Sequence, residues 1–453
     1  MKSRTKYLLF LDLLGANGAL ILAFLFLSEE PFRYFHPTAA GVVRGMVIVV
    51  SVLFTSYFME LYSRDTCYDI PGLAARIAIA VNLSFVGLLF FIFLIPTLSI
   101  GQRTLTCYLL GFGLMQFLVH AAFRFIEQKF ELLPRVLILG VGPLAAKMGE
   151  ILAGLTNNYI LTGFMPAGSE PIVVPRDKVL GDGTNLLDTA MRKRVDKIVV
   201  AVSDRFNEYP LQEILSCKLR GIYVMDAPTF YEKVMGRMLI EQITPEWFIF
   251  SQGFQISSLR RAVKRSADIL ISLLVLPLLA LLFPLIALVI KLDSAGPVFF
   301  GQIRTGEHEK PFTLYKLRTM DNNAESDTGA VWAQDNDPRI TRIGNFLRKC
   351  RLDEFPQLYN VLRGDMSIVG PRPERPEFIE QLKEIIPYYS ERHLIKPGVT
   401  GWAQVNYPYG ASVEDAVEKL RYDLYYLKNF SIRLDIMVIL ETIKVIFNQR
   451  GGR

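Results

Sequence analysis

Apolar residues form four long stretches in the first part of the chain, at about 7–27, 41–59, 77–98 and 105–123. Each stretch is close to the roughly 20 residues that an α-helix needs to cross a bilayer core. The first has no small-residue cleavage site and three more follow it, so it is expected to be a membrane helix rather than a cleaved signal peptide. We therefore predict a four-helix transmembrane bundle over residues 1–127.

Charged residues within and around these stretches refine the picture. Asp12 lies inside the first stretch, where a carboxylate is costly, so it is either a functional residue or a polar contact between helices. Basic residues lie before the first helix and after the fourth, namely Lys2, Arg4, Lys6, Arg124, Lys129 and Arg135. Because basic residues flanking membrane helices favour the cytoplasmic side, both ends of the bundle are predicted to face the cytoplasm.

The pattern changes to short apolar strands alternating with helices over residues 128–254. This alternation predicts a Rossmann-like α/β accessory domain with a parallel sheet. After the first strand, Gly140-Val141-Gly142-Pro143-Leu144-Ala145 has the glycine spacing of a turn that cradles a pyrophosphate at a helix start. No acidic residue ends the second strand near 163–167 to hold a ribose. Ligand binding and a purely structural role of the two glycines therefore both stay open.

A fifth apolar stretch, residues 268–290, has features that argue against a plain membrane span. Basic residues lie on both sides of it, at Arg260, Arg261, Lys264 and Arg265 before it and at Lys291 and Arg304 after it. Flanks of this kind favour the same, cytoplasmic, face of the membrane. Pro277 and Pro284 interrupt the stretch, and a proline bends a helix by removing a hydrogen bond. We predict a re-entrant helix, bent at one of these prolines; the alternative is a kinked span.

The remainder of residues 255–453 is polar, rich in glycine and proline, and predicts an α-rich catalytic domain that lies on the membrane. Residues 432–447 have one apolar helical face, which predicts either contact with the membrane interface or packing against this domain. Asp353 and Glu354 are expected in the first turn of a short helix that ends at Gly364. Such a pair usually serves capping alone, but helix starts attract anions and basic residues surround this one. Those basic residues are Arg348, Lys349, Arg351, Arg363 and Arg372.

Composition excludes several other classes of protein. The chain has 453 residues, of which 51% are hydrophobic, and its mean hydropathy of +0.29 is too high for a wholly soluble enzyme. The net charge of +6 is modest, so no nucleic-acid partner is expected. The four cysteines, Cys67, Cys107, Cys217 and Cys350, form no CxxC pair, and the four histidines have no metal-ligand spacing. Neither a disulfide framework nor a zinc site is therefore indicated.

Several ordered motifs carry a family resemblance. They are Lys-Arg-Ser-Ala-Asp (264–268), Lys-Leu-Asp-Ser-Ala-Gly-Pro-Val-Phe-Phe (291–300), Tyr-Lys-Leu-Arg-Thr-Met (315–320), the string from Arg351 to Pro376, and Lys-Pro-Gly-Val-Thr-Gly-Trp-Ala-Gln-Val (396–405). Together they resemble the monotopic phosphoglycosyl transferases, bacterial enzymes of the inner (cytoplasmic) membrane that move a sugar 1-phosphate onto a polyprenyl phosphate. The resemblance extends from about residue 264 to the C-terminus. Residues 331–334, 374–378 and 406–412 resemble the members used in exopolysaccharide synthesis.

The resemblance implies roles for named residues. Asp353 would attack the sugar-proximal phosphorus of a UDP-sugar, giving an aspartyl phosphosugar and UMP, and undecaprenyl phosphate would then take the sugar phosphate. Glu354 would bind Mg²⁺. Arg348 and Arg372 would contact the phosphates and the nucleotide sugar. Further candidates are Lys316 and Arg318 for phosphate, with a solvated basic face as the alternative, and Gln357 and Asn360 for orienting the carboxylates, with plain helix-surface roles as the alternative.

A second function class stays open at this point. The chain could be a membrane scaffold or regulator that senses nucleotide sugar through its α/β domain, with Asp353 as a relic. The intact set of Asp353, Glu354, Arg348 and Arg372 argues for the enzyme. The expected partners are a UDP-sugar, a polyprenyl phosphate and membrane lipids, while the identity of the sugar, the lipid length and homo-oligomer formation are left open.

Overall fold

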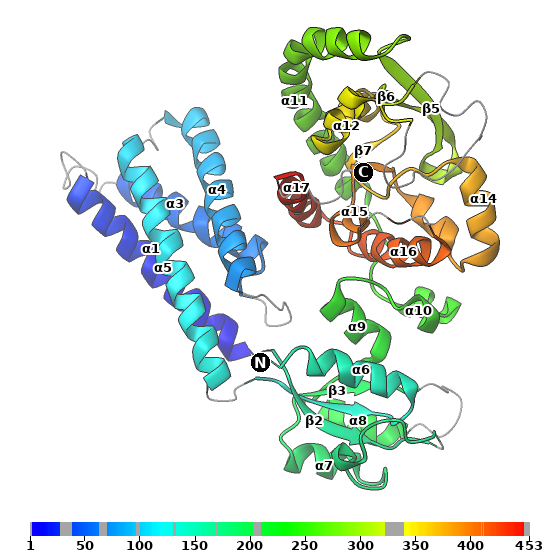
Figure 1. The fold of residues 1–453 in the computed structure, drawn as a ribbon. Coiled ribbons are helices and arrows are strands. Elements are labelled where there is room, and N and C mark those ends of the chain that lie inside the picture. The colour runs from blue at the N-terminus through cyan, green and yellow to red at the C-terminus, as the bar shows by residue number, and fades with distance from the viewer. Residues whose placement is uncertain are drawn as a thin grey trace. The chain divides into compact units, whose positions relative to one another are not determined.

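The computed structural model describes residues 2–27, 39–62, 70–96, 100–129, 133–156, 158–168, 170–202, 210–321, 339–408, 410 and 412–447. The chain forms two compact units, residues 1–234 and 235–453 (Figure 1). The first contains a helical bundle and an α/β domain, and the second contains the acidic pair. Cys67 and the 331–334 segment lie outside the described residues.

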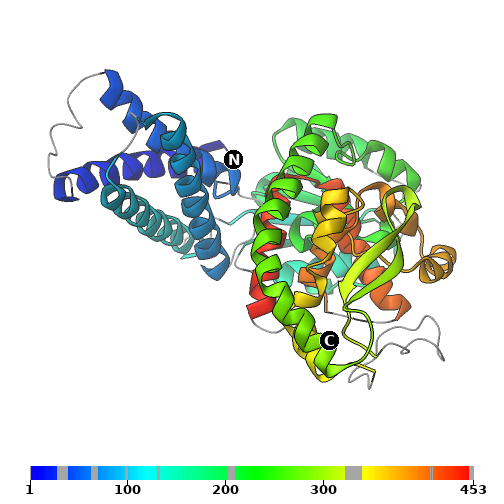
Figure 2. The same cartoon turned by 90° about the horizontal axis from the view of Figure 1, so that it is seen from above.

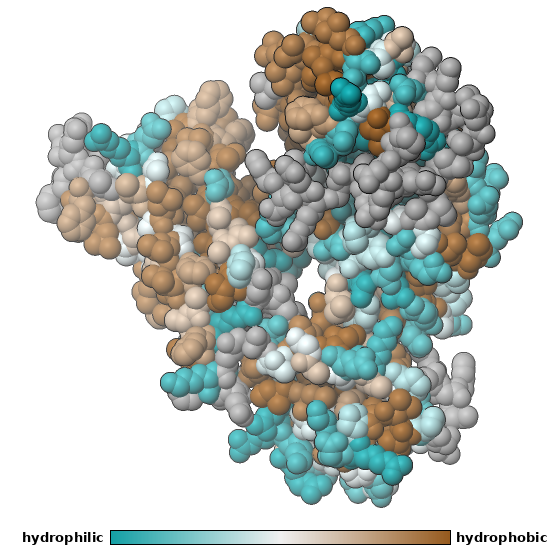
Figure 3. Space-filling model, in the orientation of Figure 1, coloured by the Kyte–Doolittle hydropathy of each residue, from teal (hydrophilic) through white to brown (hydrophobic). Residues whose placement is uncertain are grey.

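Four long apolar helices confirm the predicted membrane segments. They are α1 (Lys2–Leu27), α3 (Ala39–Phe58), α4 (Ile70–Leu94) and α5 (Gln102–Lys129). All four are long and apolar enough to cross a membrane, and at most 33% of any span is buried inside the protein. Their exposed faces are strongly apolar (Figure 3), which suits contact with lipid tails rather than water.

Asp12 makes a polar contact between helices. One of its carboxylate oxygens, Oδ2, accepts hydrogen bonds from Tyr62 Oη at 2.8 Å and Gln116 Nε2 at 2.6 Å, and lies 3.1 Å from His120 Nε2. Asp12 is fully buried, so these partners replace the water that the carboxylate loses. The contact joins α1 to α5 and to the turn after α3.

The α/β domain is built on a four-stranded parallel sheet. Its strands are β1 (Arg135–Leu139), β2 (Ile160–Met165), β3 (Lys197–Val200) and β4 (Tyr223–Asp226), in the order β2-β1-β3-β4. The connecting segments contain α6 (Pro143–Ala153), η2 (Arg176–Lys178), α7 (Leu186–Arg192) and α8 (Leu211–Leu219), and α9 (Ala227–Met235) follows β4. This order matches the first four strands of flavodoxin-like doubly wound sheets, 2-1-3-4-5, whereas the Rossmann sheet has the order 3-2-1-4-5-6.

The second unit begins before the expected domain boundary at residues 254 and 255. The segment 235–254 contains η3 (Ile240–Gln242) and α10 (Pro245–Phe250), and it packs into the core of this unit. Trp247 is 7% exposed, and Trp402 Nε1 donates to the Gly236 carbonyl at 2.7 Å. The alternating pattern of the α/β domain does not reveal this packing, because the segment has neither a strand nor a long helix.

The rest of the second unit is mainly helical, with two small sheets. Its helices are α11 (Ser258–Asp293), α12 (Arg342–Lys349), α13 (Gln357–Arg363), α14 (Pro376–Ile385), α15 (Trp402–Asn406), α16 (Val413–Lys428) and α17 (Ile432–Phe447), with 3₁₀ turns η4 (Glu307–Glu309), η5 (Leu352–Glu354) and η6 (Tyr389–Leu394). The strands β5 (Phe299–Thr305) and β6 (Pro311–Leu317) form an antiparallel hairpin, and β7 (Ser367–Val369) pairs in parallel with β8 (Gly398–Thr400). One face of α17 is buried in the core at Leu434 and Val438, which is the packing alternative for this helix.

The helix α11 is bent within the predicted re-entrant stretch. Its parts Ser258–Pro277 and Leu279–Asp293 make an angle of 55° (Figure 2). Pro277 lies at the break, whereas Pro284 lies inside the second part. Because proline cannot donate a backbone hydrogen bond and clashes with the preceding turn, a bend is expected in a helix that contains two prolines.

Candidate active site

The acidic pair lies on a separate 3₁₀ turn rather than in the first turn of a helix. Asp353 and Glu354 belong to η5, and α13 starts only after Pro356. Arg351, the residue before η5, has a left-handed backbone with φ 57°, which reverses the chain after α12. As predicted, Gly364 ends α13, with φ 101°. The short turn presents both carboxylates between two helices.

Apolar side chains fasten this turn to the second part of α11. Leu352 and Phe355, on either side of the acidic pair, pack in a cluster with Phe283, Ile286 and Ile290. The rings of Phe283 and Phe355 meet edge to face with centroids 6.3 Å apart. Full burial of such a side chain contributes about 1.5–3 kcal/mol, and the partly buried side chains among these contribute a part of that each. The position of the carboxylates is therefore tied to the helix that is predicted to enter the membrane.

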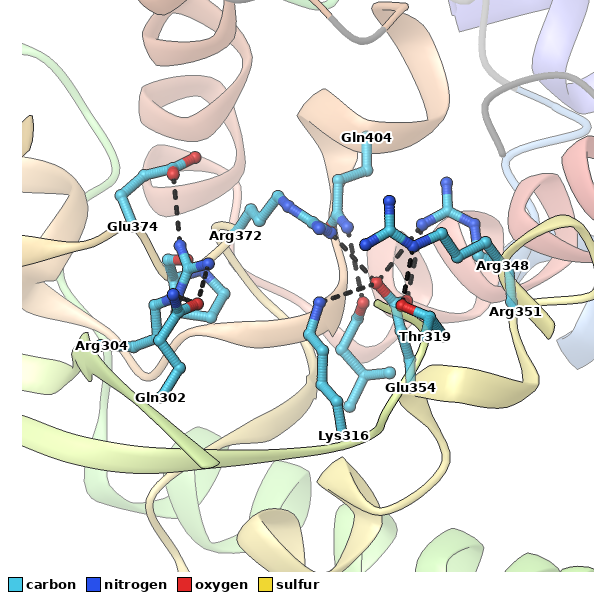
Figure 4. Close-up of polar contacts among 12 residues, drawn as sticks. Gln302, Arg304, Lys316, Thr319, Arg348, Arg351, Glu354, Arg372, Glu374 and Gln404 are labelled. Atoms are coloured by element: carbon cyan, nitrogen blue, oxygen red, sulfur yellow. Dashed lines mark hydrogen bonds and ion pairs between the residues drawn. The ribbon is translucent and has the colours of Figure 1, made fainter. Parts of the chain in front are cut away.

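Three cations surround the carboxylate of Glu354 (Figure 4). Its Oε1 lies 3.4 Å from Arg372 Nη1, 3.5 Å from Arg351 Nη1 and 3.7 Å from Lys316 Nζ. Burial acts to raise the pKa of Glu354, but Lys316, Arg372 and Arg351 outweigh it and lower the pKa to about 2. Burial lowers the pKa of Lys316 to about 8, although Glu354 acts against this change. Glu354 is thus an anion within a strongly positive site.

Asp353 has a different environment from its neighbour. The residue is 6% exposed, and its Oδ1 atom is buried without a hydrogen-bond partner among the described residues. Burial, and then the charge of Glu354, raise the pKa of Asp353 above its usual value, while Lys316, Arg348 and Arg351 act to lower it. A carboxylate oxygen with few hydrogen bonds is a better nucleophile than one that is fully solvated.

The other predicted residues fall into two groups. Arg348 and Arg372 lie at the site: Arg348 donates from Nε to Thr319 Oγ1 at 2.9 Å, and Arg372 contacts Glu354. Arg318 instead donates to the Ser294 and Ala295 carbonyls at 2.7 and 3.0 Å, holding the end of α11. Asn360 donates to the Thr313 carbonyl at 2.8 Å and joins α13 to β6.

Three more residues, Gln357, Gln404 and Thr319, lie around the acidic pair. Gln357 is 4% exposed and lies on the first turn of α13. Gln404 of α15 extends toward the space between Arg348 and Arg372 (Figure 4), although its motif in the sequence gives no sign of a role in the site. Thr319, which holds Arg348, was also missed, because a lone threonine after a strand carries no sequence signal for a site.

The acidic pair fits one mode of Mg²⁺ binding. This ion keeps several waters and is usually held by one or two carboxylates together with substrate phosphates. Asp353 and Glu354 provide two carboxylates, and Asp353 Oδ1 has no competing donor among the described residues. Among all the residues that the structure describes, no group of three His, Cys, Asp or Glu side chains could hold a metal ion by itself. The acidic pair therefore suits a Mg²⁺ ion that is also bound by the phosphates of the substrate.

In the glycine turn of the α/β domain, a carboxylate of the same chain accepts a hydrogen bond from the backbone at the helix start. The backbone N–H of Gly142, at the start of α6, donates to Glu170 Oε2 at 3.3 Å. Any Cβ atom at Gly142 would come within 2.8 Å of the same carboxylate. Val173 N–H also donates to the Val141 carbonyl at 2.9 Å, so the 170–173 segment lies along the turn. A carboxylate of the chain thus holds the place where a phosphate would bind.

Comparison with known proteins matches residues 259–449 to the family described as bacterial sugar transferase. The UDP-N-acetylgalactosamine-undecaprenyl-phosphate N-acetylgalactosaminephosphotransferase of Aeromonas hydrophila is 41% identical over 237 residues, 52% of this chain and 55% of that protein. The UDP-glucose:undecaprenyl-phosphate glucose-1-phosphate transferase of Escherichia coli (strain K12) is 43% identical over 190 residues, 42% of this chain and 41% of that protein.

A shorter relative is matched almost completely. The exopolysaccharide production protein PSS of Rhizobium leguminosarum bv. phaseoli is 43% identical over 186 residues, 40% of this chain and 93% of that protein. By contrast, the chain spans about half the length of the two longer curated relatives, 55% and 41%. The alignment with the shorter relative, 186 residues, is about as long as the family match at residues 259–449. That match contains the acidic pair.

Proposed function

The chain belongs to the bacterial sugar transferase family, and we propose that it transfers a sugar 1-phosphate from a UDP-sugar to undecaprenyl phosphate, releasing UMP. The observation that carries the proposal is the buried Asp353–Glu354 turn among three cations, within the matched residues 259–449. The names of two relatives specify N-acetylgalactosamine and glucose, so the donor is a UDP-hexose or UDP-N-acetylhexosamine. A role as scaffold or regulator is not favoured.

The first chemical step would use Asp353 as nucleophile. One of its carboxylate oxygens forms a bond to the sugar-proximal phosphorus of the donor, and the bond from this phosphorus to the bridging oxygen breaks. The bridging oxygen leaves with UMP, and an aspartyl phosphosugar remains. Arg372, Arg351 and Lys316 suit this step because they place positive charge where the negative charge of the phosphates gathers.

The second step would return Asp353 to its starting state. A phosphate oxygen of the lipid forms a bond to the phosphorus of the aspartyl phosphosugar, and the bond to the Asp353 oxygen breaks. The product is a lipid diphosphate that carries the sugar. Mg²⁺ held by Glu354, Asp353 and substrate phosphates would supply further positive charge for both steps.

The contacts of α11 support a re-entrant topology with the site at the membrane surface. Arg265, before the bend, donates to the Val361 carbonyl of α13, and Phe283, after the bend, packs on Phe355. Both parts of α11 therefore contact the same short region, 355–361. A straight span would put these contacts on opposite sides of the bilayer. We place the site on the cytoplasmic side of the bacterial inner membrane, where nucleotide sugars are made, at the level of the lipid phosphate.

The exopolysaccharide-type motifs and the name of the Rhizobium relative support a place in exopolysaccharide synthesis. The transfer would be the first membrane step, because it creates the lipid-linked sugar on which later sugars are added. The α/β domain would be accessory to this chemistry, since its glycine turn is closed by Glu170.

A direct test is UMP release by the purified full chain in nanodiscs with undecaprenyl phosphate, Mg²⁺ and a panel of UDP-sugars. We expect release with one donor or a few, and only background release by Asp353→Asn, on the order of 10³-fold lower. Glu354→Gln should lose activity and need more Mg²⁺ for any that remains. If no UDP-sugar gives UMP, or if Asp353→Asn is active, the proposed reaction is wrong.

A further inference from the structure

The loop that carries Arg372 has no regular secondary structure, yet several of its backbone carbonyls accept hydrogen bonds. Four consecutive carbonyls accept hydrogen bonds: Pro371 from Gly398 N at 2.9 Å, Arg372 from Arg392 Nη2 at 3.0 Å, Pro373 from Arg304 Nη1 at 3.2 Å, and Glu374 from Thr305 N at 3.0 Å. The donors lie on β8, η6 and β5. Two prolines also restrict the loop's backbone dihedrals. The position of Arg372 is therefore set by elements far from it in the sequence.

Arg392 is the donor that reaches Arg372 itself, and it is a buried charge. The residue is 4% exposed, and its guanidinium lies 2.7 Å from Asp423 Oδ2 on α16. It also donates from Nη1 to Tyr389 Oη at 2.7 Å. Asp423 is 1% exposed, and burial raises the pKa of its carboxyl while Arg392 acts to lower it.

Stability alone is a weak reason for such a pair. Taking two charges out of water costs several kcal/mol, and apolar side chains of similar volume often stabilise a core as well or better. The guanidinium is also planar, so Asp423 and Tyr389 together set the direction in which its N–H groups point. Nη2, the nitrogen that lies 2.7 Å from Asp423 Oδ2, also donates to the Arg372 carbonyl.

We infer that Arg392, held by Asp423, is a positioning residue that aims Arg372 at the acidic turn. Arg372 makes both contacts: its carbonyl accepts from Arg392, and its Nη1 lies 3.4 Å from Glu354 Oε1. Fixing the carbonyl fixes the backbone from which the side chain leaves. The inference rests on the proposed function, because it gives Arg392 a role in binding the nucleotide sugar through Arg372.

The test is a double-mutant cycle in the full chain, with UMP release as readout. Arg392→Lys keeps the charge but loses the planar fork, and it is measured with either Arg372 or Arg372→Lys at the other position. We expect Arg392→Lys to lower kcat/KM about tenfold when Arg372 is present, mostly through a higher KM for the UDP-sugar. With Arg372→Lys the further loss should be less than about twofold, because there is little left to position.

The matched control is Arg421→Lys. Arg421 is also a buried arginine, on α16 beside Asp423, but its partners are Glu418 and Glu241. Its loss, if any, should be the same in both backgrounds. If Arg392→Lys does not fold, Asp423→Asn is measured in its place in the same two backgrounds. The asparagine keeps an oxygen acceptor for Arg392 but removes the negative charge.

The outcomes are separable. Equal losses for Arg392→Lys in both backgrounds, or no loss, would overturn the positioning role and leave the proposed reaction standing. A wild-type chain that releases no UMP with any donor would overturn the reaction, and the positioning role with it.

Discussion

Arg265, on the part of α11 before the bend, donates from Nη1 to the carbonyl of Val361 in the last turn of α13 at 2.5 Å. Its Nη2 donates to the next carbonyl, that of Leu362, at 2.8 Å. The last carbonyls of a helix have no partner within the helix, so Arg265 caps the C-terminus of α13. Two hydrogen bonds from Arg265 thus connect α11 to α13, the helix that follows the acidic turn.

The first prediction tests this cap. Arg265→Met leaves two carbonyls without their charged donor, and it should destabilise the second unit by about 1–3 kcal/mol and lower activity. Arg261→Met is the matched control, because Arg261 is half exposed and pairs only with Glu307 at 3.0 Å among the contacts described. Thermal unfolding and UMP release measure the two effects. Equal behaviour of both variants would contradict the cap.

The second prediction concerns pH. Because the pKa of Lys316 is lowered to about 8, its charge is present below that pH and lost as the pH rises through it. The kcat/KM for the UDP-sugar, which reports the free enzyme, should therefore fall above about pH 8. At acid pH it should fall as Asp353 is protonated, at a pH above the usual aspartate range because its pKa is raised. Lys316→Arg should remove the alkaline fall; a fall that persists unchanged would assign it elsewhere.

The predicted features differ in how much the sequence could determine. Span length and apolar content located the membrane helices, and strand–helix alternation located the parallel sheet, because both are local patterns. Lys316 and Arg318 look equivalent in sequence, but β6 ends at Leu317, so Arg318 turns away to Ser294 while Lys316 faces Glu354. The Arg392–Arg372 contact joins two separate segments of the chain, so no periodic pattern in the sequence predicts it. These contacts arise only from tertiary packing.

The third prediction follows from the packing of residues 235–254. All residues of the candidate site lie in the second unit, so its fragment 235–453, placed in a membrane, should turn over without the four-helix bundle. The fragment 255–453 should be less stable, because it lacks buried Trp247 and Met238. Activity of the two purified fragments, together with their thermal midpoints, checks this. An inactive but folded 235–453 fragment would give the first unit a catalytic part.

The fourth prediction concerns topology. Ser258, at the start of α11, and Ala295, two residues after its end, should lie on the same side of the membrane. Single cysteines at these positions, in a variant without native cysteines, can be probed with a membrane-impermeant thiol reagent on intact cells. Both should react only after the cells are opened. Reaction at position 295 from outside would mean that α11 crosses the bilayer, and the site would then be away from its donor.

The most direct measurement is capture of the covalent intermediate. The full chain is mixed with an active UDP-sugar and Mg²⁺ but no lipid phosphate, quenched, and analysed by intact and peptide mass spectrometry. The account predicts a burst of about one UMP per chain, an added mass equal to one sugar phosphate on the peptide that contains Asp353, and loss of that mass when undecaprenyl phosphate is added. UMP release that requires the lipid from the start, with no adduct on Asp353, would contradict the covalent mechanism.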